Sequence, residues 1–535
     1  MGVLDPSRGL PEREALGADA ESTQDDSFVS ILNPDRVSAP GETGEQPDFF
    51  ADLNLDQVCA AMFAKRDEYK LTPFFYEPLH ECSIVRYRQA VLQDLERDEI
   101  VAVIRSFASQ MADVRRHLDN VRKLRSGLQK QSWLLAALDD YCTAVSRLGA
   151  DLAGVDLLSA GLRKLSAYVS EYVHSRAFKA LSKETEAMLA QLATVVYTVR
   201  TDGPRVTVDR PSGQPDLTVQ VEETFAKFRQ GNVKSYLVRF NEYLEMNHVE
   251  LQVLDRVAAL FPQEFEHLQE FCTRNRSAFN ATLLRFDREV QFFLSYLEFI
   301  APLRAAGLSF AYPRVDVSSK ETSVTQAFDL ALAAKLTEAG EPVVCNDVTL
   351  GGAERLLVIT GPNQGGKTTF ARMFGQLHHL AALGLPVPGA EAQLFLPDRI
   401  FTHFEREEDL STLHSKFEDD LYRIHAILRE ATSSSVLVMN ESLTSTTLKD
   451  AIAVGTLVLR QIIQMQMLCL CVTFVDELAS LSENVVSMMS TVENDDPTVR
   501  TFKIVRKPAD GLAYAVALAD KYRLGYEQLK RRVER

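Results

Sequence analysis

The chain has 535 residues, of which 46% are hydrophobic and 25% are charged, and its formal net charge is -16. This composition is ordinary for a globular protein and excludes a collagen, a disulfide-rich miniprotein and a chain disordered throughout. The length suggests roughly three or four domains. The seven cysteines form no Cys-x-x-C pair, which argues against a zinc ribbon and a thioredoxin-like redox site.

The chain lacks the signals of export and of membrane insertion. No stretch approaches the ~18 consecutive apolar residues of a membrane-spanning helix. The N-terminus has no basic segment followed by an apolar one, as a secretory signal would have. The odd number of cysteines and the absence of Cys-x-x-C pairs also suit a reducing compartment. We therefore expect a cytoplasmic protein that does not span a membrane.

The acidity is concentrated at the N-terminus. Residues 1–48 hold eleven Asp or Glu against three Arg, a net charge of -8. Because proline, glycine and serine accompany these charges, we predict a largely disordered acidic tail. The rest of the chain is only mildly acidic, which leaves room for a local DNA-contacting face.

Residues 49–301 have the pattern of a helical core and lever domain, with apolar residues three and four positions apart. A small β insertion is predicted near 193–221, because β-branched residues in 193–200 and 205–210 flank the turn signal at 201–204 (TDGP) and residues 217–221 extend the pattern. Residues 200–239 carry seven basic and five acidic side chains, a weak electrostatic footprint for DNA. A solvated hairpin and a DNA-contacting one therefore both remain open.

The pattern over 262–306 predicts one long helix with a coiled-coil-like seam. At ~1.5 Å per residue such a helix could exceed ~50 Å. It could be a packed structural helix or a lever that transmits motion.

Residues 302–535 have the texture of an α/β domain. Apolar runs at 356–360, 436–439 and 468–473 are typical of parallel strands that are buried on both faces. Helices are predicted at 426–432 and 449–465. The fold class expected from the whole sequence is thus multidomain: an all-α core with long lever helices and a small β insertion, followed by an α/β P-loop domain of the ABC-like kind.

A phosphate-binding loop follows the first of these strands. It matches G-x-x-x-x-G-K-[ST] and consists of Gly361, Pro362, Asn363, Gln364, Gly365, Gly366, Lys367, Thr368 and Thr369. The glycines let backbone N–H groups face phosphate oxygens, and the helix that follows adds its positive end. Lys367 is expected to reach the β- and γ-phosphates, and the Thr368 hydroxyl to bind Mg²⁺.

The strand at 436–439 ends in Asn440-Glu441, where Asp-Glu would be usual. Glu441 can serve as the base that polarises the attacking water. Asn440 can accept a hydrogen bond from a metal-bound water but brings no negative charge, so Mg²⁺ would be held weakly. Normal hydrolysis, slow hydrolysis with ATP acting as a conformational ligand, and a dead site all remain open.

These segments resemble the MutS family of DNA mismatch-repair ATPases. Residues 360–369 (TGPNQGGKTT) resemble that family's TGPN-x-GGKST, and residues 436–447 (VLVMNESLTSTT) resemble its LVLMDEIGRGTST. Four further segments keep the family's order. Residues 385–390 (LPVPGA) resemble its VPA segment, and residues 398–403 (DRIFTH) resemble its DRIFTR segment. Residues 408–417 (EDLSTLHSKF) resemble its DDL-x-S-G-x-STF loop, and residues 473–478 (TFVDEL) resemble its THYFEL segment. The resemblance is specific over 302–535 and less specific over 49–301.

The resemblance implies that ATP and Mg²⁺ are bound and that Glu441 and Lys367 are catalytic. Ser415 matches the serine that reaches the γ-phosphate of the partner subunit, which implies a homodimer with composite ATP sites. A helix N-cap ahead of residues 417–428 explains Ser415 equally well. His403 and His414 lie nearer the presumed site than other histidines, but we assign neither a catalytic role.

Several positions depart from the family pattern. Asn440 stands where the family has Asp, Leu413 where the trans-acting loop has Gly, and Lys416 where that loop has Thr. Phe474 stands where the family has a His thought to sense the γ-phosphate, and Val343 falls where an adenine-stacking aromatic is common. Each departure would weaken hydrolysis or its coupling, and none removes the phosphate loop. The sequence thus indicates a divergent member.

We expect the chain to lack the family's N-terminal mismatch-recognition and connector domains, because a short acidic segment precedes the helical region. The resemblance then implies an ATPase of DNA repair or recombination, in which ATP gates a dimeric clamp that contacts DNA backbone or structure without reading mismatches. The alternative is a nucleotide-gated interaction or scaffold protein with weak or no hydrolysis and no DNA binding, which the acidic charge favours. An ABC-type chromosome-maintenance ATPase is disfavoured, because no LSGGQ-like signature precedes residue 436.

Overall fold

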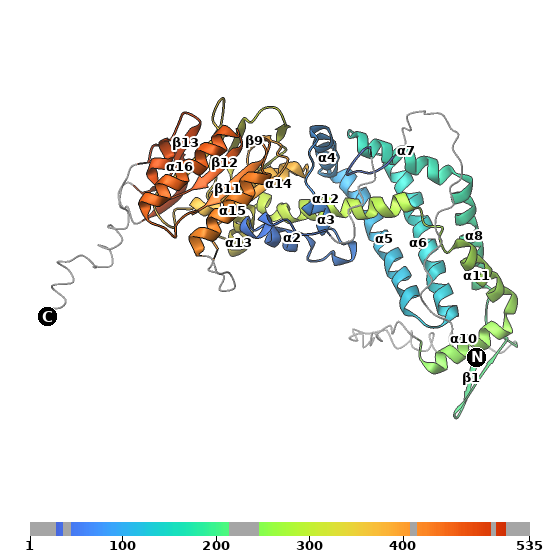
Figure 1. Ribbon diagram of the computed structural model, residues 1–535. Coiled ribbons are helices and arrows are strands. Elements are labelled where there is room, and N and C mark those ends of the chain that lie inside the picture. The colour runs from blue at the N-terminus through green and yellow to red at the C-terminus, as the bar shows by residue number, and fades with distance from the viewer. Residues whose placement is uncertain (1–27, 36–43, 213–245, 407–414, 494–498, 510–535) are drawn as a thin grey trace, which may run out of the picture.

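The computed structural model describes residues 28–35, 44–212, 246–406, 415–493 and 499–509. They form an elongated molecule, with an α/β part at one end and a helical part that extends to a β-hairpin at the far tip (Figure 1). This arrangement agrees with the expected multidomain, mixed class. None of the helices in the described ranges is both long enough and apolar enough to cross a membrane.

The helical part begins with short helices and continues with long ones. Their bounds are α1 (Phe49–Asp52), α2 (Leu55–Phe63), α3 (Thr72–Tyr76), α4 (Cys82–Leu95), α5 (Asp98–Lys123), α6 (Gly127–Ala153), α7 (Ala160–His174), α8 (Arg176–Ala193), α10 (His248–Leu260), α11 (Pro262–Asn275) and α12 (Ala281–Ala305). Ser126, Ser159 and Ser175 cap α6, α7 and α8, because each hydroxyl accepts a hydrogen bond from a first-turn amide.

The hairpin at the far tip has the predicted position. Strands β1 (Thr198–Asp202) and β2 (Arg205–Asp209) pair antiparallel, and Asp202 faces Arg205 at the turn. Gly203 has a φ of +57° there, a conformation that glycine adopts without steric cost. Residues 217–221, the predicted extension of the insertion, lie outside the described residues.

The prediction of one unbroken helix over 262–306 is wrong. Helix α11 ends at Asn275, and α12 begins after Asn280, whose side chain accepts hydrogen bonds from the amides of Thr282 and Leu283. The same side chain donates to the hydroxyl of Tyr168 at 2.8 Å. The three-and-four spacing continues across the break because both helices bury apolar side chains in the same core. Helix α12, with 25 residues, is about 38 Å long.

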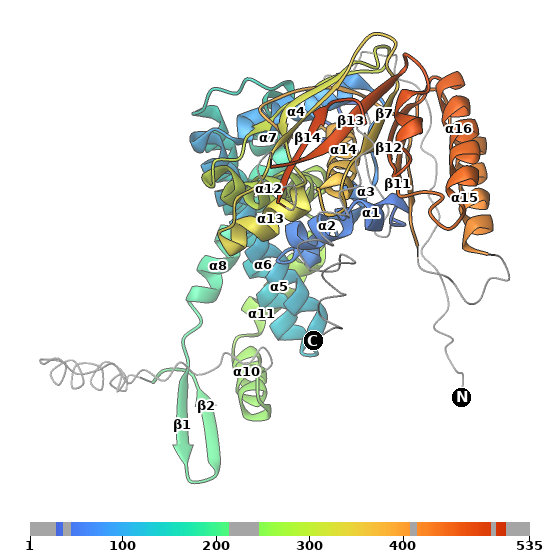
Figure 2. The ribbon, with the colours of Figure 1, turned by 90° about the vertical axis from the view of Figure 1, so that its left-hand side faces the viewer.

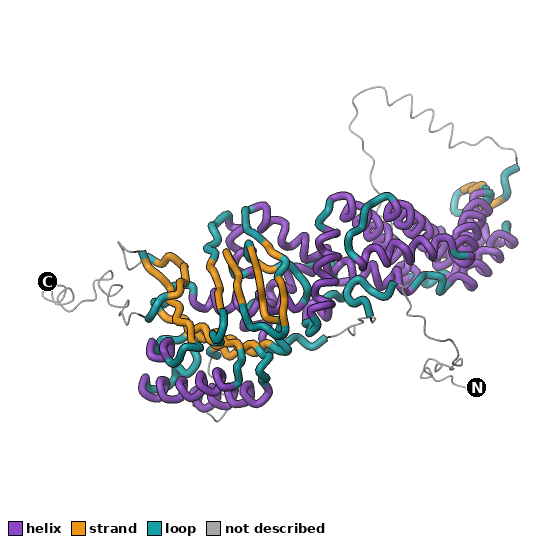
Figure 3. Tube along the Cα trace, turned by 90° about the horizontal axis from the view of Figure 1, so that it is seen from above, coloured by secondary structure: helices purple, strands orange, loops and turns teal. Residues whose placement is uncertain are grey.

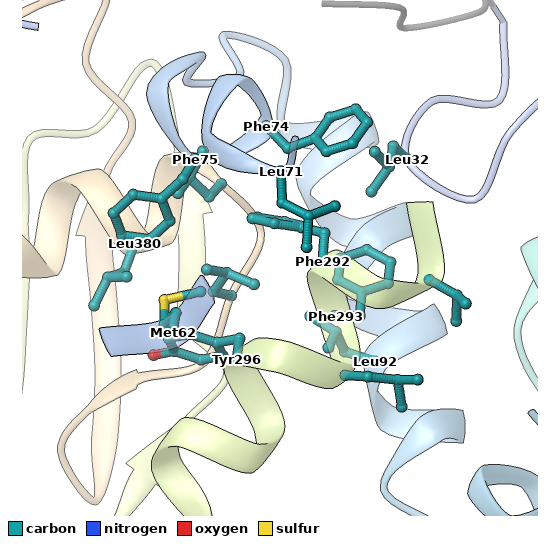
Figure 4. Packing of buried hydrophobic residues seen from close by; sticks show 14 of the residues in the cluster. Leu32, Met62, Leu71, Phe74, Phe75, Leu92, Phe292, Phe293, Tyr296 and Leu380 are labelled. Atoms are coloured by element: carbon teal, nitrogen blue, oxygen red, sulfur yellow. The ribbon is translucent and has the colours of Figure 1, made fainter. Parts of the chain in front are cut away.

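One hydrophobic core joins the helical part to the α/β part. Figure 4 shows Phe74 and Phe75 of α3 beside Phe292 and Phe293 of α12, with Leu380 of the α/β part in the same cluster. All five side chains are buried. Burial of a side chain of this size stabilises the fold by about 1.5–3 kcal/mol, so the shared core holds the two parts together.

A short segment near the N-terminus also belongs to this core. Phe28, Ile31 and Leu32 are at most 4% exposed. Ser30 Oγ donates a 2.8 Å hydrogen bond to the buried carboxylate of Glu289 on α12. Against the expectation for residues 1–48, these residues are therefore part of the folded core.

The α/β part is built on two larger sheets and a short strand pair. Strands β10 (Ile400–Phe404), β11 (Val436–Asn440), β12 (Leu468–Val472), β7 (Leu356–Thr360), β13 (Val485–Val492) and β14 (Arg500–Arg506) form one sheet in that order, parallel except for β14. The second sheet has the order β4 (Arg314–Asp316), β9 (Glu391–Phe395), β5 (Thr322–Ala327), β6 (Asn346–Leu350), and β3 (Phe310–Ala311) pairs with β8 (Val387–Pro388). The predicted strands are confirmed as β7, β11 and β12.

Helices cover both faces of the first sheet. Helix α14 (Lys367–Ala382) packs on one face, and α15 (Lys416–Glu430) and α16 (Leu448–Gln464) lie on the other (Figures 2 and 3). Leu357 and Ile359 of β7 face the α14 side, whereas Leu356 and Val358 face α15 and α16, as the alternation of strand side chains requires. Helix α15 starts earlier than the predicted 426–432, and α13 (Leu330–Ala339) contacts α2, α12 and α14.

Candidate nucleotide-binding site

The phosphate-loop sequence lies between a central strand and a helix. Strand β7, in the middle of the sheet, ends at Thr360, and α14 begins at Lys367. The first amides of a helix have no partner within it and carry its positive end. The loop therefore leads directly to a helix terminus suited to an anion, at the carboxyl edge of the parallel strands.

Two features of the loop require glycine. Gly361 and Gly366 have φ values of +107° and +87°. A Cβ on Gly361 or Gly365 would lie 2.7 or 2.6 Å from the hydroxyl oxygen of Ser490 on β13. The loop thus passes too close to β13 for any side chain at these positions.

Lys367 turns back over the loop and is 4% exposed. Its Nζ donates hydrogen bonds to the carbonyl oxygens of Gly361 and Pro362 at 2.8 and 2.9 Å. Burial lowers the pKa of Lys367, and the nearby charge of Glu441 opposes this effect. The ammonium group therefore lies at the centre of the loop, with the Glu441 carboxylate nearby.

The end of β11 brings two more predicted site residues to this edge. The amide of Glu441 donates a 3.0 Å hydrogen bond to the carbonyl oxygen of Val472, so the ladder continues past Asn440. Glu441 and Leu443 have φ values of +53° and +63°. A left-handed conformation costs a residue with a side chain about 1–2 kcal/mol, so this turn is held by its surroundings.

The comparisons with known proteins place this region in a family. Residues 357–531 match the model of MutS domain V. The match makes residues 357–531 a MutS-type domain. It is 30% identical over 231 residues to a DNA mismatch repair protein MutS of Chlorobaculum tepidum, covering 42% of this chain and 26% of that protein. It is 33% identical over 191 residues to a MutS of Erythrobacter litoralis, covering 35% and 22%. The alignments thus span about a quarter of these relatives' length.

The MutS-type loop has buried polar atoms without a hydrogen-bond partner around it. They are Thr360 Oγ1, Asn440 Oδ1 and Ser490 Oγ. Buried oxygens without partners are costly unless a ligand or water satisfies them. Asn440 Oδ1, at the carboxyl end of β11, is an oxygen of the kind that binds Mg²⁺ or a metal-bound water. The residues present therefore fit a magnesium ion, although no cluster of three His, Cys, Asp or Glu side chains occurs among the described residues.

Ser415 lies at the start of α15. Its hydroxyl accepts a hydrogen bond from the amide of Glu418 at 3.3 Å, and its own side chain is exposed. The N-cap interpretation is therefore confirmed, whereas a role toward a partner subunit stays a prediction. Leu413 and His414 lie outside the described residues.

A cavity of about 740 Å³ opens beside the loop at Gly366 and Thr369. Val343 lines it, together with the apolar side chains of Leu332 and Met373 and the exposed ring of Phe502. A mostly apolar cavity with a few polar groups is typical of a small-molecule site. The cavity thus has an aromatic ring in its lining, which comes from Phe502 of β14 and not from position 343.

Sequence reasoning missed Ser490, Arg500 and Phe502. Arg500 Nε donates a 3.1 Å hydrogen bond to the carbonyl oxygen of Asn363 in the loop. The alternating pattern of 500–506 could have predicted a strand, but no motif marks these residues. Only the pairing of β13 with β7, and of β14 with β13, brings them to the loop.

Proposed function

We propose that the protein is a MutS-type ATPase that binds MgATP at residues 361–369 and uses the nucleotide to control a dimeric, DNA-contacting assembly. The observation that carries the proposal is the geometry of the loop between β7 and α14, with Lys367 bent over it. The names of the relatives, DNA mismatch repair proteins, support the same class.

Each residue of the loop has a proposed task. Lys367 would exchange the carbonyl oxygens of Gly361 and Pro362 for the β- and γ-phosphates. Thr368 and Asn440 would hold Mg²⁺, which when bound neutralises charge on the phosphates. Glu441 would accept a proton from the attacking water. Because Asn440 lacks the charge of an aspartate, we expect weak metal binding and slow turnover.

Helix α14 offers a route from the nucleotide to the helical part. Its first turn lies at the loop, and farther along the helix Arg372 Nε donates to the carbonyl oxygen of Asp52 at 3.0 Å. Gln376 Nε2 donates to the carbonyl oxygen of Leu53 at 2.8 Å. The Asp52 carboxylate also accepts a 2.6 Å hydrogen bond from Thr402 of β10. A shift of α14 on nucleotide binding would therefore move the start of the helical part.

The hairpin at the far tip is the proposed DNA contact, and its charge is modest. Arg200 forms an ion pair with Asp209 at 3.4 Å, and Arg210 donates to the carbonyl oxygen of Leu260. Arg205 is exposed at the turn. These partners and the net charge of -16 favour the second candidate function, a nucleotide-gated interaction protein that does not bind DNA.

Two measurements test the proposal. Titration of a fluorescent ATP analogue at millimolar Mg²⁺ should show saturable binding that Lys367→Ala reduces at least about tenfold, because a charged hydrogen-bond donor to phosphate is lost. Failure of the wild type to bind would refute the nucleotide site. Gel shifts at low salt with duplex, mismatched and branched DNA, with and without ATP, then separate the candidates. Absence of binding where phosphate contacts are strongest would leave the interaction protein.

A further inference from the structure

A buried histidine links helix α15 to the residues that follow Glu441. His403 of β10 is 0% exposed and lies on the α15 side of the sheet. Its Nδ1 lies 2.7 Å from Ser442 Oγ, and its Nε2 lies 3.5 Å from an oxygen of Asp420 on α15. Asp420 is itself buried. The imidazole therefore stands between the turn after β11 and the middle of α15.

The surroundings fix the protonation of this imidazole. Burial, with a smaller effect of the Arg423 charge, lowers the pKa of His403 to about 3, so the ring is neutral and carries one N–H. If Nδ1 carried this proton, the Nε2 lone pair would face the lone pairs of the Asp420 oxygen, which is unfavourable. We therefore assign the proton to Nε2, which faces the Asp420 oxygen at 3.5 Å without a hydrogen bond in this conformation. The Ser442 hydroxyl then donates to Nδ1 at 2.7 Å, with the carbonyl oxygen of His403 at 3.4 Å as its second acceptor.

A second side chain at the end of β10 also connects α15 with the turn after β11. Glu405, two residues after His403, accepts from Lys416 in the first turn of α15 and forms an ion pair with it. It also accepts a 3.3 Å hydrogen bond from Thr444 Oγ1. His403 and Glu405 thus each connect α15 with the turn at 441–444.

The backbone of this turn is strained at two positions. Glu441 and Leu443, on either side of Ser442, both have positive φ. Such conformations persist where neighbouring contacts over-determine them, and they cluster at functional sites. The contact from Ser442 to His403 lies at the centre of this strained turn, next to the proposed base.

We propose that Ser442, His403 and Asp420 are positioning residues, which hold the Glu441 carboxylate in place and couple it to α15. The inference rests on the proposed function and deepens it, because it names how the same site is regulated. Ser415 caps the N-terminus of α15, so movement of this terminus by a partner subunit would reach Glu441 through this relay. Phosphate binding at the loop would act on α15 by the same route.

The test uses the whole 535-residue chain and the variants Ser442→Ala, Ser442→Thr and His403→Phe. Ser442→Ala removes the hydroxyl, Ser442→Thr keeps it, and His403→Phe keeps the ring volume without its nitrogens. Ser487→Ala is the matched control. The hydroxyl of Ser487 donates to the carbonyl oxygen of Lys507 near the start of β13, at the end of the strand away from the phosphate loop. For each protein we would measure nucleotide Kd, the steady-state ATPase rate, the melting temperature, and hydrogen exchange of α15 amides with and without MgATP.

We expect Ser442→Ala and His403→Phe to lower kcat about tenfold with Kd changed less than about twofold, since a misplaced base affects the reaction and not ground-state binding. The nucleotide-dependent protection of α15 should disappear in both and persist in Ser442→Thr and Ser487→Ala. If wild-type turnover is too slow to measure, the exchange result alone decides.

Three results would overturn the relay. The first is nucleotide-dependent protection of α15 in Ser442→Ala that equals the wild type. The second is a loss of kcat in Ser442→Thr as large as in Ser442→Ala. The third is a loss of kcat that is proportional to the loss of melting temperature in every variant. A wild type that binds no nucleotide would overturn the proposed function and the relay together. Normal binding with any of the three results overturns the relay alone.

Discussion

The ammonium nitrogen of Lys367 lies 5.0 Å from the centre of the Phe474 ring. This ring is 47% exposed and stands where the family has a histidine. A cation over an aromatic face at an exposed site is stabilised by about 0.5–1 kcal/mol. Together with the two carbonyl oxygens of the loop, Phe474 therefore stabilises the bent conformation of Lys367.

Phe474→Ala should tighten nucleotide binding by about two- to fivefold, because Lys367 would no longer give up the ring contact when it turns to the phosphates. Titration of a fluorescent ATP analogue measures the change. Phe502→Ala is the paired control. This variant also removes an exposed aromatic ring near the loop. Because the Phe502 ring lines the cavity beside the loop, its loss should weaken nucleotide binding. Weaker binding in Phe474→Ala would show that Phe474 contacts the nucleotide instead.

Asn440→Asp should lower the Mg²⁺ concentration needed for half-maximal nucleotide binding about tenfold and raise turnover. The substitution places a negative charge where Asn440 Oδ1 is now buried without a partner, and a charged acceptor binds about twice as strongly as a neutral one. The measurement is ATPase rate against Mg²⁺ concentration. If neither the rate nor the Mg²⁺ dependence changes, weak metal binding by Asn440 is not what limits turnover.

The docked segment at 28–33 should make stability depend on pH through Glu289. Burial raises the pKa of Glu289 to about 7, although hydrogen bonds from Ser30 and Ile31 and the charges of Arg285 and Arg88 oppose the shift. A raised carboxyl pKa favours the protonated form in the folded state. Its stabilising contribution is complete below about pH 4.5 and is lost as the pH rises through 7.

Glu289→Gln removes this titration. It keeps an acceptor for the Ile31 amide, and its NH2 group can donate to the Ser30 hydroxyl oxygen in place of the bond that the carboxylate accepts. Relative to this variant, the wild type should lose about 2–3 kcal/mol of stability between pH 4.5 and 8, because the shift spans more than two pKa units. Thermal unfolding of both proteins across that range measures the difference. A gap between the two melting temperatures that stays constant with pH would contradict the assignment.

What the sequence could predict depends on local chemistry. The strand before residue 361, the glycines with positive φ and the hairpin turn at Gly203 each follow from a few neighbouring residues. The strands β7, β11 and β12 are recognisable because burial on both faces leaves continuous apolar runs.

The remainder depends on contacts between distant segments. The break after α11 is fixed by Asn280, whose partner Tyr168 is 112 residues away. Ser30 belongs to the core because Glu289 lies 259 residues downstream. His403 gains its partners only when β10 pairs with β11 and α15 covers them. Periodicity and motif spacing carry no information about such pairs.

The contact between α14 and the helical part gives the last prediction. Gln376 is fully buried, and its Oε1 accepts from the amide of Leu330 at 2.8 Å while its Nε2 donates to the carbonyl oxygen of Leu53 at 2.8 Å. Gln376→Met keeps the size but leaves two buried backbone groups unpaired. At about 1–3 kcal/mol for each group, it should reduce the free energy of unfolding by about 2–6 kcal/mol.

Urea unfolding measures this loss. The matched control is Gln57→Met on α2, where an exposed glutamine donates to Asn54 and accepts from Lys335. Because both bonds lie at the surface, this variant should change stability by no more than about 0.5 kcal/mol. Gln376→Met should also uncouple ATP from DNA binding if α14 transmits movement through Leu53. Wild-type stability in Gln376→Met would mean that Leu330 and Leu53 find other partners, and the route from the phosphate loop would then have to run through Arg372 and Asp52.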